Sequence, residues 1–78
     1  MKTVIVYTQP NCPPCEFAKN YFADKKIDII IKDVKKNRKA YEELTKKYKS
    51  YSTPTIVIDD EVIIGFKQDQ IESLLGLS

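Results

Sequence analysis

Two cysteines separated by two prolines, Cys12-Pro13-Pro14-Cys15, are the residues best suited to chemistry in this sequence. They are the only cysteines among the 78 residues, and the chain has no histidine. The run from Val4 to Tyr7 before them is rich in β-branched residues, and aromatic residues between positions 17 and 22 follow them with helical spacing. The pair is therefore predicted to lie where a strand turns into a helix.

The start of a helix favours a reactive thiolate. Cys12 is expected near the N-cap and Pro13 at the first helical position, where the missing N–H of proline costs nothing. Unpaired N–H groups and a partial positive charge at a helix N-terminus favour an anion, so the pKa of Cys12 is expected below that of a free cysteine. The thiolate attacks disulfides. Cys15, one helical turn later on the same face, can then resolve a sulfur held at Cys12.

The sequence supports other roles for the two cysteines less well. Zinc takes four ligands, so a chain with two cysteines and no histidine would have to share one zinc ion between two copies. A purely structural disulfide would close a very small loop, and the stabilisation from a disulfide grows with loop length. Two inert core cysteines would both have to face inward, and a position at the start of a helix disfavours this. The spacing therefore favours thiol–disulfide exchange.

Composition fits one small soluble domain covering residues 1–78. Hydrophobic residues make up 42% and charged residues 31%, and the net charge of +2 is smaller than nucleic-acid binding domains usually carry. No apolar run approaches the length of a membrane span, and we expect no signal peptide, since Met1-Lys2-Thr3 passes straight into the first predicted strand. We therefore expect a cytoplasmic monomer without nucleic-acid or membrane partners. In that reducing compartment a Cys-x-x-Cys pair is more often catalytic than structural.

The apolar patterns predict an α/β domain. The first strand, helix and second strand form a βαβ unit with parallel strands, the second strand being buried around Ile29 to Ile31. The acidic turn at 59–61 joins an antiparallel hairpin. The result is a four-stranded mixed sheet with helices on both faces, in the order β-α-β-α-β-β-α. Strands are expected at 3–8, 27–32, 55–58 and 62–64, and helices at 13–25, 37–48 and 68–75.

The second predicted helix has two different faces. Asn37 is a plausible N-cap, and Tyr41, Leu44 and Tyr48 fall on one apolar stripe. Such a stripe should face the sheet. The opposite face is basic, and simple solvation is the ordinary meaning of such a face, although it could attract an anionic thiol substrate or an acidic partner. Its cations are Arg38, Lys39, Lys46, Lys47 and Lys49.

Three features together have the pattern of a known family: the strand leading into Cys12-Pro13-Pro14-Cys15, Thr53-Pro54 before a hairpin, and Gly65 after the fourth strand. With them the whole chain resembles a glutaredoxin of the thioredoxin superfamily. The resemblance implies a thioredoxin-like fold without the leading strand and helix, and a cis peptide bond between Thr53 and Pro54. It implies that Cys12 attacks a disulfide or a glutathione mixed disulfide and that Cys15 resolves it, giving a reversible Cys12–Cys15 disulfide. Glutathione is then the expected co-substrate, with no tightly bound cofactor and no metal.

The same resemblance implies which residues surround the cysteines. Gln9 stands where typical glutaredoxins carry a lysine. Lys67 and Gln68 stand where acidic residues hold the γ-glutamyl end of glutathione, so two of the charged contacts are altered. The residues expected to line the site are Tyr7, Pro13, Pro14, Thr53, Pro54, Gly65 and Phe66.

The C-terminal part is similar to a second group. The segment from Gly65 to Ile71 resembles the ending of the small redoxins that serve ribonucleotide reductase and are reduced by thioredoxin reductase. This implies an alternative in which thioredoxin reductase supplies the electrons and ribonucleotide reductase, or another disulfide-containing protein, receives them. Two alternatives come from other classes. One is a module for zinc or for a glutathione-assisted [2Fe–2S] cluster, which Pro13 disfavours by resemblance. The other is a redox-inert adaptor using the basic helix face.

Overall fold

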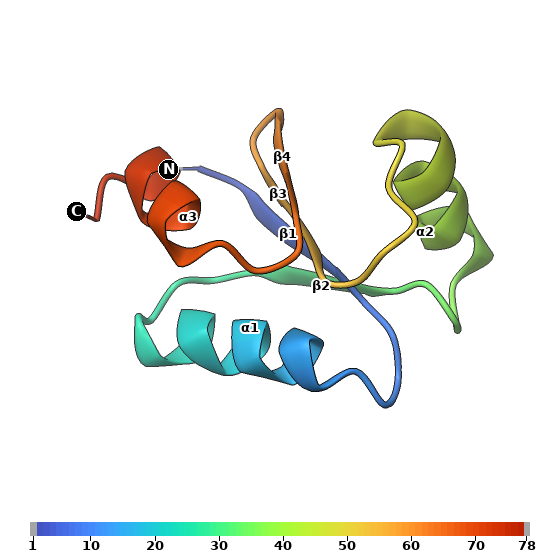
Figure 1. Cartoon of the computed structure of the whole chain (residues 1–78), viewed down its shortest axis with the longest axis horizontal. Coiled ribbons are helices and arrows are strands. Elements are labelled where there is room, and N and C mark those ends of the chain that lie inside the picture. Colours follow the sequence, from blue (N-terminus) through green and yellow to red (C-terminus); the bar gives the residue numbers. More distant parts are fainter. Residues whose placement is uncertain (1, 78) are drawn as a thin grey trace.

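The computed structural model describes residues 2–77 (Figure 1). Met1 and Ser78, the two ends of the domain expected from the sequence, lie outside the described residues. The elements along the chain are β1 (Val4–Thr8), α1 (Pro13–Asp24), β2 (Ile30–Asp33), α2 (Arg38–Glu42), the π-helical turn η1 (Glu43–Lys47), β3 (Thr55–Ile58), β4 (Glu61–Ile64) and α3 (Gln68–Leu75).

The four strands form one mixed sheet in the order β2-β1-β3-β4. β1 and β2 are parallel and are joined through α1, whereas β1 pairs antiparallel with β3 and β3 with β4. Helices α1 and α3 lie on one side of the sheet and α2 on the other (Figure 1). The α/β class, the parallel βαβ unit and the hairpin predicted from the sequence are confirmed.

The larger core lies between the sheet and the pair α1 and α3. Alternate residues of β1 and β3 face this layer because successive side chains of a strand point to opposite sides. They meet Phe22 of α1 and Ile71 of α3, both without exposed surface. The buried members of this core are Val4, Val6, Ala18, Phe22, Ile56, Ile58, Ile63 and Ile71.

The smaller core lies on the other face of the sheet, beneath α2 and η1. Tyr7 and Val57 from the central strands meet Ala40 and Leu44 from the helical segment. Ala40 is 1% exposed. Its small side chain lets the helix come close to the sheet. This helical segment is short and therefore covers the middle of that face only.

The second strand differs from its prediction. It begins at Ile30 rather than at residue 27, and Ile30 and Ile31 are 49% and 52% exposed rather than buried. The reason is tertiary, because β2 is an edge strand that pairs only with β1. Ile27 and Ile29, in the connection before it, pack against the larger core instead.

The second helix is also less regular than predicted. The N-cap at Asn37 is confirmed, since its side chain accepts a hydrogen bond from the Ala40 N–H at 3.1 Å. The segment then widens into the π-helical turn η1. The predicted stripe is wrong for Tyr41, which is 52% exposed because the neighbouring Ala40 takes the position against the sheet.

Phe22→Ala should lower the free energy of unfolding by about 3–5 kcal/mol, because it empties the centre of the larger core. Phe17→Ala on the same helix is the matched control, since Phe17 is 59% exposed and its loss should change stability by less than about 1 kcal/mol. Urea unfolding of both variants in one redox state measures the difference. Equal losses in the two variants would contradict this account of the core.

Candidate functional site

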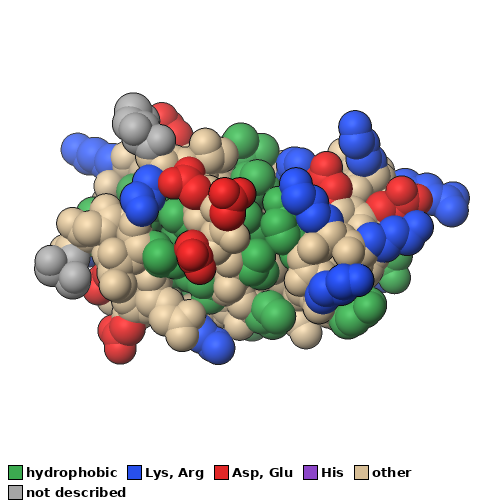
Figure 2. Space-filling view, turned by 90° about the horizontal axis from the view of Figure 1, so that it is seen from above, with side chains coloured by type: hydrophobic (Ala, Val, Ile, Leu, Met, Phe, Trp, Pro, Cys, Tyr) green, Lys and Arg blue, Asp and Glu red, His purple; other side chains and the backbone are tan. Residues whose placement is uncertain are grey.

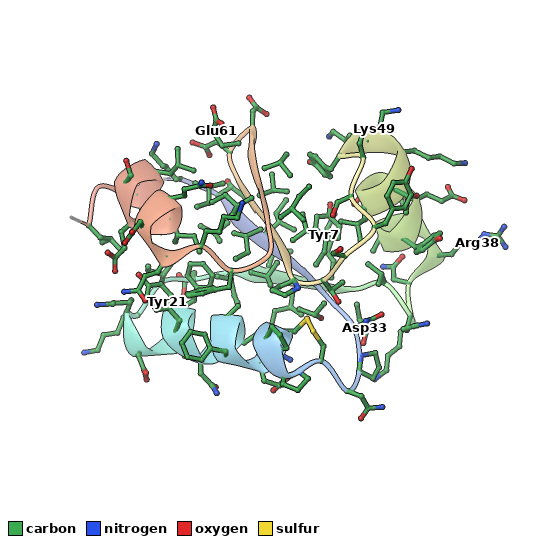
Figure 3. The ribbon with its side chains drawn as sticks, in the orientation of Figure 1. Tyr7, Tyr21, Asp33, Arg38, Lys49 and Glu61 are labelled. Carbon is green, nitrogen blue, oxygen red and sulfur yellow. A yellow bond between two sulfur atoms is a disulfide. The ribbon has the colours of Figure 1, made fainter. Side chains whose placement is uncertain are left out.

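The two cysteines differ in their surroundings. Cys12 is the N-cap of α1, with an extended backbone, and Cys15 lies in the first helical turn. Their Cα atoms are 5.2 Å apart and their sulfur atoms form a disulfide at the start of α1 (Figure 3). Cys12 is 8% exposed, whereas Cys15 is fully buried. A substrate sulfur can therefore reach Cys12 and not Cys15.

The two prolines limit the hydrogen bonds that Cys12 can accept. Pro13 and Pro14 occupy the first two helical positions and have no N–H group. The first helical N–H that remains is that of Cys15, and it donates to the Cys12 sulfur at 3.3 Å. The N–H groups of the second and third helical positions are the ones that can donate to an N-cap side chain. Because Pro14 occupies the second position, only the third, the Cys15 N–H, can serve the Cys12 sulfur in this chain.

Thr53 is the other residue close to the Cys12 sulfur. The peptide bond between Thr53 and Pro54 is cis, as the resemblance implied. The Cys12 sulfur is 3.8 Å from the Thr53 carbonyl oxygen and 3.6 Å from the Thr53 hydroxyl oxygen. The chain thus brings residues 41 positions apart into contact at the sulfur.

A buried pair of hydroxyls holds the loop that carries Thr53. Ser50 and Thr55, which are 1% and 0% exposed, have their hydroxyl oxygens 2.7 Å apart. The Thr55 hydroxyl donates to the Ser52 carbonyl at 2.7 Å. These bonds tie together the two ends of the loop. These bonds could not be predicted from the sequence, because Ser and Thr are common in any polar loop.

Gly65 and Phe66 complete this end of the molecule. The Gly65 N–H donates to the Pro54 carbonyl at 2.8 Å, and Gly65 has a φ of +86°, a backbone conformation that favours glycine. The Phe66 ring packs edge-on against Phe17 at 5.1 Å and Tyr21 at 5.2 Å. Phe17 also borders an open hollow of about 800 Å³ beside Cys12. Its other lining residues are Asn11, Pro13, Glu16 and Asn20.

A hydrogen bond between helices supports this aromatic group. The Tyr21 hydroxyl of α1 donates to a Glu72 carboxylate oxygen of α3 at 2.8 Å. Burial, together with this bond and the carboxylate charge, raises the pKa of Tyr21 to about 12. The phenol therefore stays protonated near neutral pH and keeps donating.

Tyr7 lies elsewhere. Its side chain is 1% exposed in the smaller core beneath α2, on the face of the sheet away from α1. Its hydroxyl donates to Glu43 at 3.0 Å, and Lys32 donates to the same carboxylate oxygen at 2.7 Å. Burial raises the pKa of Tyr7, and the Lys32 hydrogen bond holds the pKa of Glu43 below its usual range. Tyr7, which was expected to line the site, therefore lies in a separate network.

A second hollow, of about 350 Å³, opens beyond Thr53. Tyr51, which is 80% exposed, and Tyr41 stand at this hollow. Sequence reasoning missed both as site residues. None of the lining side chains is charged. They are Gln9, Val34, Tyr41, Leu44, Thr45, Tyr51, Ser52 and Thr53.

Residues 2–77 were also expected to hold neither a metal site nor a membrane span. Across these residues there is no group of three or more Cys, His, Asp or Glu side chains arranged to hold a metal ion. No helix in the same range is long and apolar enough to cross a membrane.

Comparison with known proteins identifies the family. The sequence model of the Glutaredoxin family matches residues 4–63, which include both cysteines and the Thr53–Pro54 bond. The chain belongs to the glutaredoxin family. The cysteine pair, close enough to form a disulfide, and the thioredoxin-like fold make it a redox protein of the thiol–disulfide oxidoreductase type.

Three related proteins illustrate the range of this glutaredoxin's relatives. The Gene 56 protein of Mycobacterium phage L5 is 38% identical over 73 residues, covering 92% of this chain and 71% of its own. An uncharacterized glutaredoxin-like 8.6 kDa protein in the rubredoxin operon of Clostridium pasteurianum is 34% identical over 70 residues, covering 90% of this chain and 93% of its own. The crystal structure of a variant of the thioredoxin-like protein BC3987 superposes with a TM-score of 0.94 at 42% identity, covering 100% of both chains.

Pro14→Ala should increase the fraction of Cys12 present as thiolate in the reduced glutaredoxin, because it restores an N–H donor at the second helical position. The pH midpoint of Cys12 alkylation should fall by on the order of half a pH unit. Iodoacetamide rates against pH, in a Cys15→Ser background, measure this shift.

Pro13→Ala is the matched control, because an N–H at the first helical position does not point at the N-cap side chain. Its alkylation midpoint should stay where it is in the parent protein. A shift of equal size in both variants, or in neither, would show that the missing donor at position 14 does not govern the sulfur.

Proposed function

We propose that this glutaredoxin catalyses dithiol–disulfide exchange, with Cys12 as the nucleophile and Cys15 as the resolving thiol. The observation that carries the proposal is the contrast between a helix-capping, accessible Cys12 and a fully buried Cys15 whose N–H donates to the Cys12 sulfur. A low-pKa thiol at a helix start is the attacking species, and a neighbouring thiol closed to solvent can react only with what Cys12 holds.

The exchange balances in two steps. The Cys12 thiolate attacks one sulfur of a substrate disulfide, forms a mixed disulfide and releases the other substrate sulfur, which takes up a proton. The Cys15 thiol then loses its proton and attacks the Cys12 sulfur, releasing the second substrate thiol and leaving the Cys12–Cys15 disulfide. Two electrons pass from the protein to the substrate. Two external thiol groups reduce the Cys12–Cys15 disulfide by the reverse sequence, passing through a mixed disulfide at Cys12 and leaving as a disulfide themselves.

The surrounding residues are proposed to receive the substrate. The Thr53 backbone, next to the Cys12 sulfur, suits pairing with an extended peptide segment. Pro13 lines the hollow beside Cys12, and Phe66 packs against Phe17, which lines the same hollow. Pro54 and Gly65 shape the backbone nearby through their hydrogen bond. Pro14 limits the hydrogen bonding of the sulfur. Tyr7 supports the sheet from the α2 side and is assigned no contact with the substrate.

Cys12→Ser should abolish exchange, with a loss of at least about a thousandfold in rate, because no other accessible thiol is present. Cys15→Ser should keep the first step and accumulate a mixed disulfide. Mass spectrometry after mixing with a glutathionylated peptide and with a protein disulfide measures both outcomes. Exchange at the parental rate in Cys12→Ser would refute the assignment of the nucleophile.

Glutathione is the co-substrate that we propose first, on family membership. A specific observation supports thioredoxin reductase as the second candidate. Glutathione carries two carboxylates, yet the hollow beyond Thr53 is lined by neutral side chains, including Gln9. At the other end of the site, Lys67 and Gln68 are exposed and offer no acid for the γ-glutamyl amino group. In that second case the electrons would pass on to ribonucleotide reductase or another protein disulfide.

Paired NADPH-oxidation assays on the oxidised protein separate the two donors. One holds glutathione with glutathione reductase, the other thioredoxin reductase, and Cys12→Ser is the blank in each. We expect turnover with glutathione, because backbone contacts at Thr53 need no charged side chain. Turnover with thioredoxin reductase alone would reject glutathione as the co-substrate and support the second candidate.

A further inference from the structure

An exposed phenylalanine stands beside the proposed nucleophile. Phe17 of α1 is 59% exposed and lines the same open hollow as Cys12. It follows Cys12 by five positions, which is about 7.5 Å along a helix axis. Within residues 2–77 it belongs to neither core. A single exposed phenylalanine is ordinary on a protein surface, so its meaning depends on what supports it and what meets it.

A series of aromatic rings holds Phe17 at the hollow. Phe66 packs edge-on against Phe17 at 5.1 Å and against Tyr21 at 5.2 Å. Tyr21, which lies where α1 meets α3 (Figure 3), packs in turn against Phe22 of the larger core at 5.4 Å. The exposed ring therefore rests on a support that is anchored in the core. A substrate group that contacts it has little side-chain freedom to immobilise.

The hollow beside Cys12 has no positively charged lining residue among residues 2–77. Glu16 is the one charged side chain that lines it, and Glu16 pairs with Lys19. The clustered cations of α2 and η1 lie across the sheet from α1. Figure 2, which views the face opposite α1, shows Lys and Arg side chains gathered at the end that carries these two segments.

The exchange reaction limits what can occupy this hollow. In the mixed disulfide the substrate cysteine is bonded to the Cys12 sulfur, so its neighbours in the substrate lie at the hollow. An extended peptide advances about 3.3 Å per residue, so side chains one or two positions from that cysteine come within reach of Phe17. Glutathione places a glycine and a γ-glutamyl group there, and both carry carboxylates rather than apolar side chains. A polypeptide can place a large apolar side chain there.

We propose that Phe17 is a specificity-determining residue that makes exchange faster with polypeptide disulfides bearing a large apolar side chain one or two residues from the reactive cysteine. This role rests on the proposed function, because Cys12 must be the attacking thiol. It concerns the disulfide that receives the electrons and leaves the proposed electron donor unchanged. The contact with Phe17 forms as the substrate sulfur approaches Cys12, so it stabilises the transition state relative to the free reactants.

Two short peptides with blocked ends test this role. Each holds its central cysteine in a mixed disulfide with thionitrobenzoate, a coloured leaving group, and the cysteine is flanked on both sides by leucine in one peptide and by serine in the other. The Cys12 thiolate attacks the peptide sulfur and releases thionitrobenzoate. Cys15 then releases the peptide thiol and leaves the Cys12–Cys15 disulfide, so two electrons pass to the substrate. Each rate with the reduced protein is divided by the rate with dithiothreitol, which corrects for the intrinsic reactivity of the peptide.

The parent protein should react about tenfold faster with the leucine peptide than with the serine peptide. Phe17→Ser should bring this ratio close to one, because it removes the apolar surface that the leucine side chains contact. Phe17→Leu should keep most of the ratio, since that surface is retained. A ratio near one in the parent, or the same ratio in the parent and in Phe17→Ser, would overturn the proposal.

Tyr51→Ser is the matched control. Tyr51 is also an exposed aromatic residue, at 80%, but it lines the hollow beyond Thr53 and not the hollow that contains Cys12. This variant should therefore show the ratio of the parent. Loss of the ratio in Tyr51→Ser, with the ratio kept in Phe17→Ser, would mean that the apolar side chain lies in the other hollow and would contradict the role of Phe17.

The release of thionitrobenzoate also tests the exchange at Cys12 separately. Release by the parent from both peptides, and by Cys12→Ser from neither, supports exchange at Cys12 whatever the ratio between the peptides. Equal corrected rates in that case would reject the role of Phe17 and leave the proposed function standing. No release by the parent from either peptide would refute the proposed function and the role of Phe17 together.

Discussion

The position of the Cys12 sulfur between the start of α1 and the Thr53 loop is the contact on which the site depends. The Cys15 N–H lies 3.3 Å from the sulfur, and the Thr53 hydroxyl lies 3.6 Å from it. Neither group could be in place unless α1 began directly after β1 and β3 lay next to β1 in the sheet. The strand order β2-β1-β3-β4 provides both conditions.

The rest of the fold fixes the positions of the start of α1 and of the loop that carries Thr53. The larger core fixes α1 through Phe22, and the Tyr21–Glu72 hydrogen bond joins α1 to α3. The buried hydroxyls of Ser50 and Thr55 brace the loop that carries Thr53. Packed elements thus meet at the sulfur atom that we propose as the nucleophile, and this would fix the geometry of approach that disulfide exchange requires.

Parts of the fold and of the site could be predicted from the sequence because they depend on local residue preferences. The strand, the Cys-x-x-Cys turn, the helix that follows and the hairpin depend on residues close together in the chain, and the structure agrees with them. The errors concern neighbours that the sequence does not reveal. Whether Ile31 is buried depends on which strand lies at the edge, and whether Tyr41 faces inward depends on how closely Ala40 lets α2 approach. The placement of Tyr7 beneath α2 likewise depends on Glu43, a residue 36 positions away.

The closeness of the cysteines has a consequence for recognition. The disulfide links residues three positions apart within one helix start, so opening or closing it requires no movement of the sheet or of the other helices. The oxidised and reduced forms therefore present nearly the same outline to the rest of the cell. A partner that must bind one form and release the other therefore has to contact the sulfur atoms and their immediate neighbours, since surfaces far from the cysteines would be the same in both redox states.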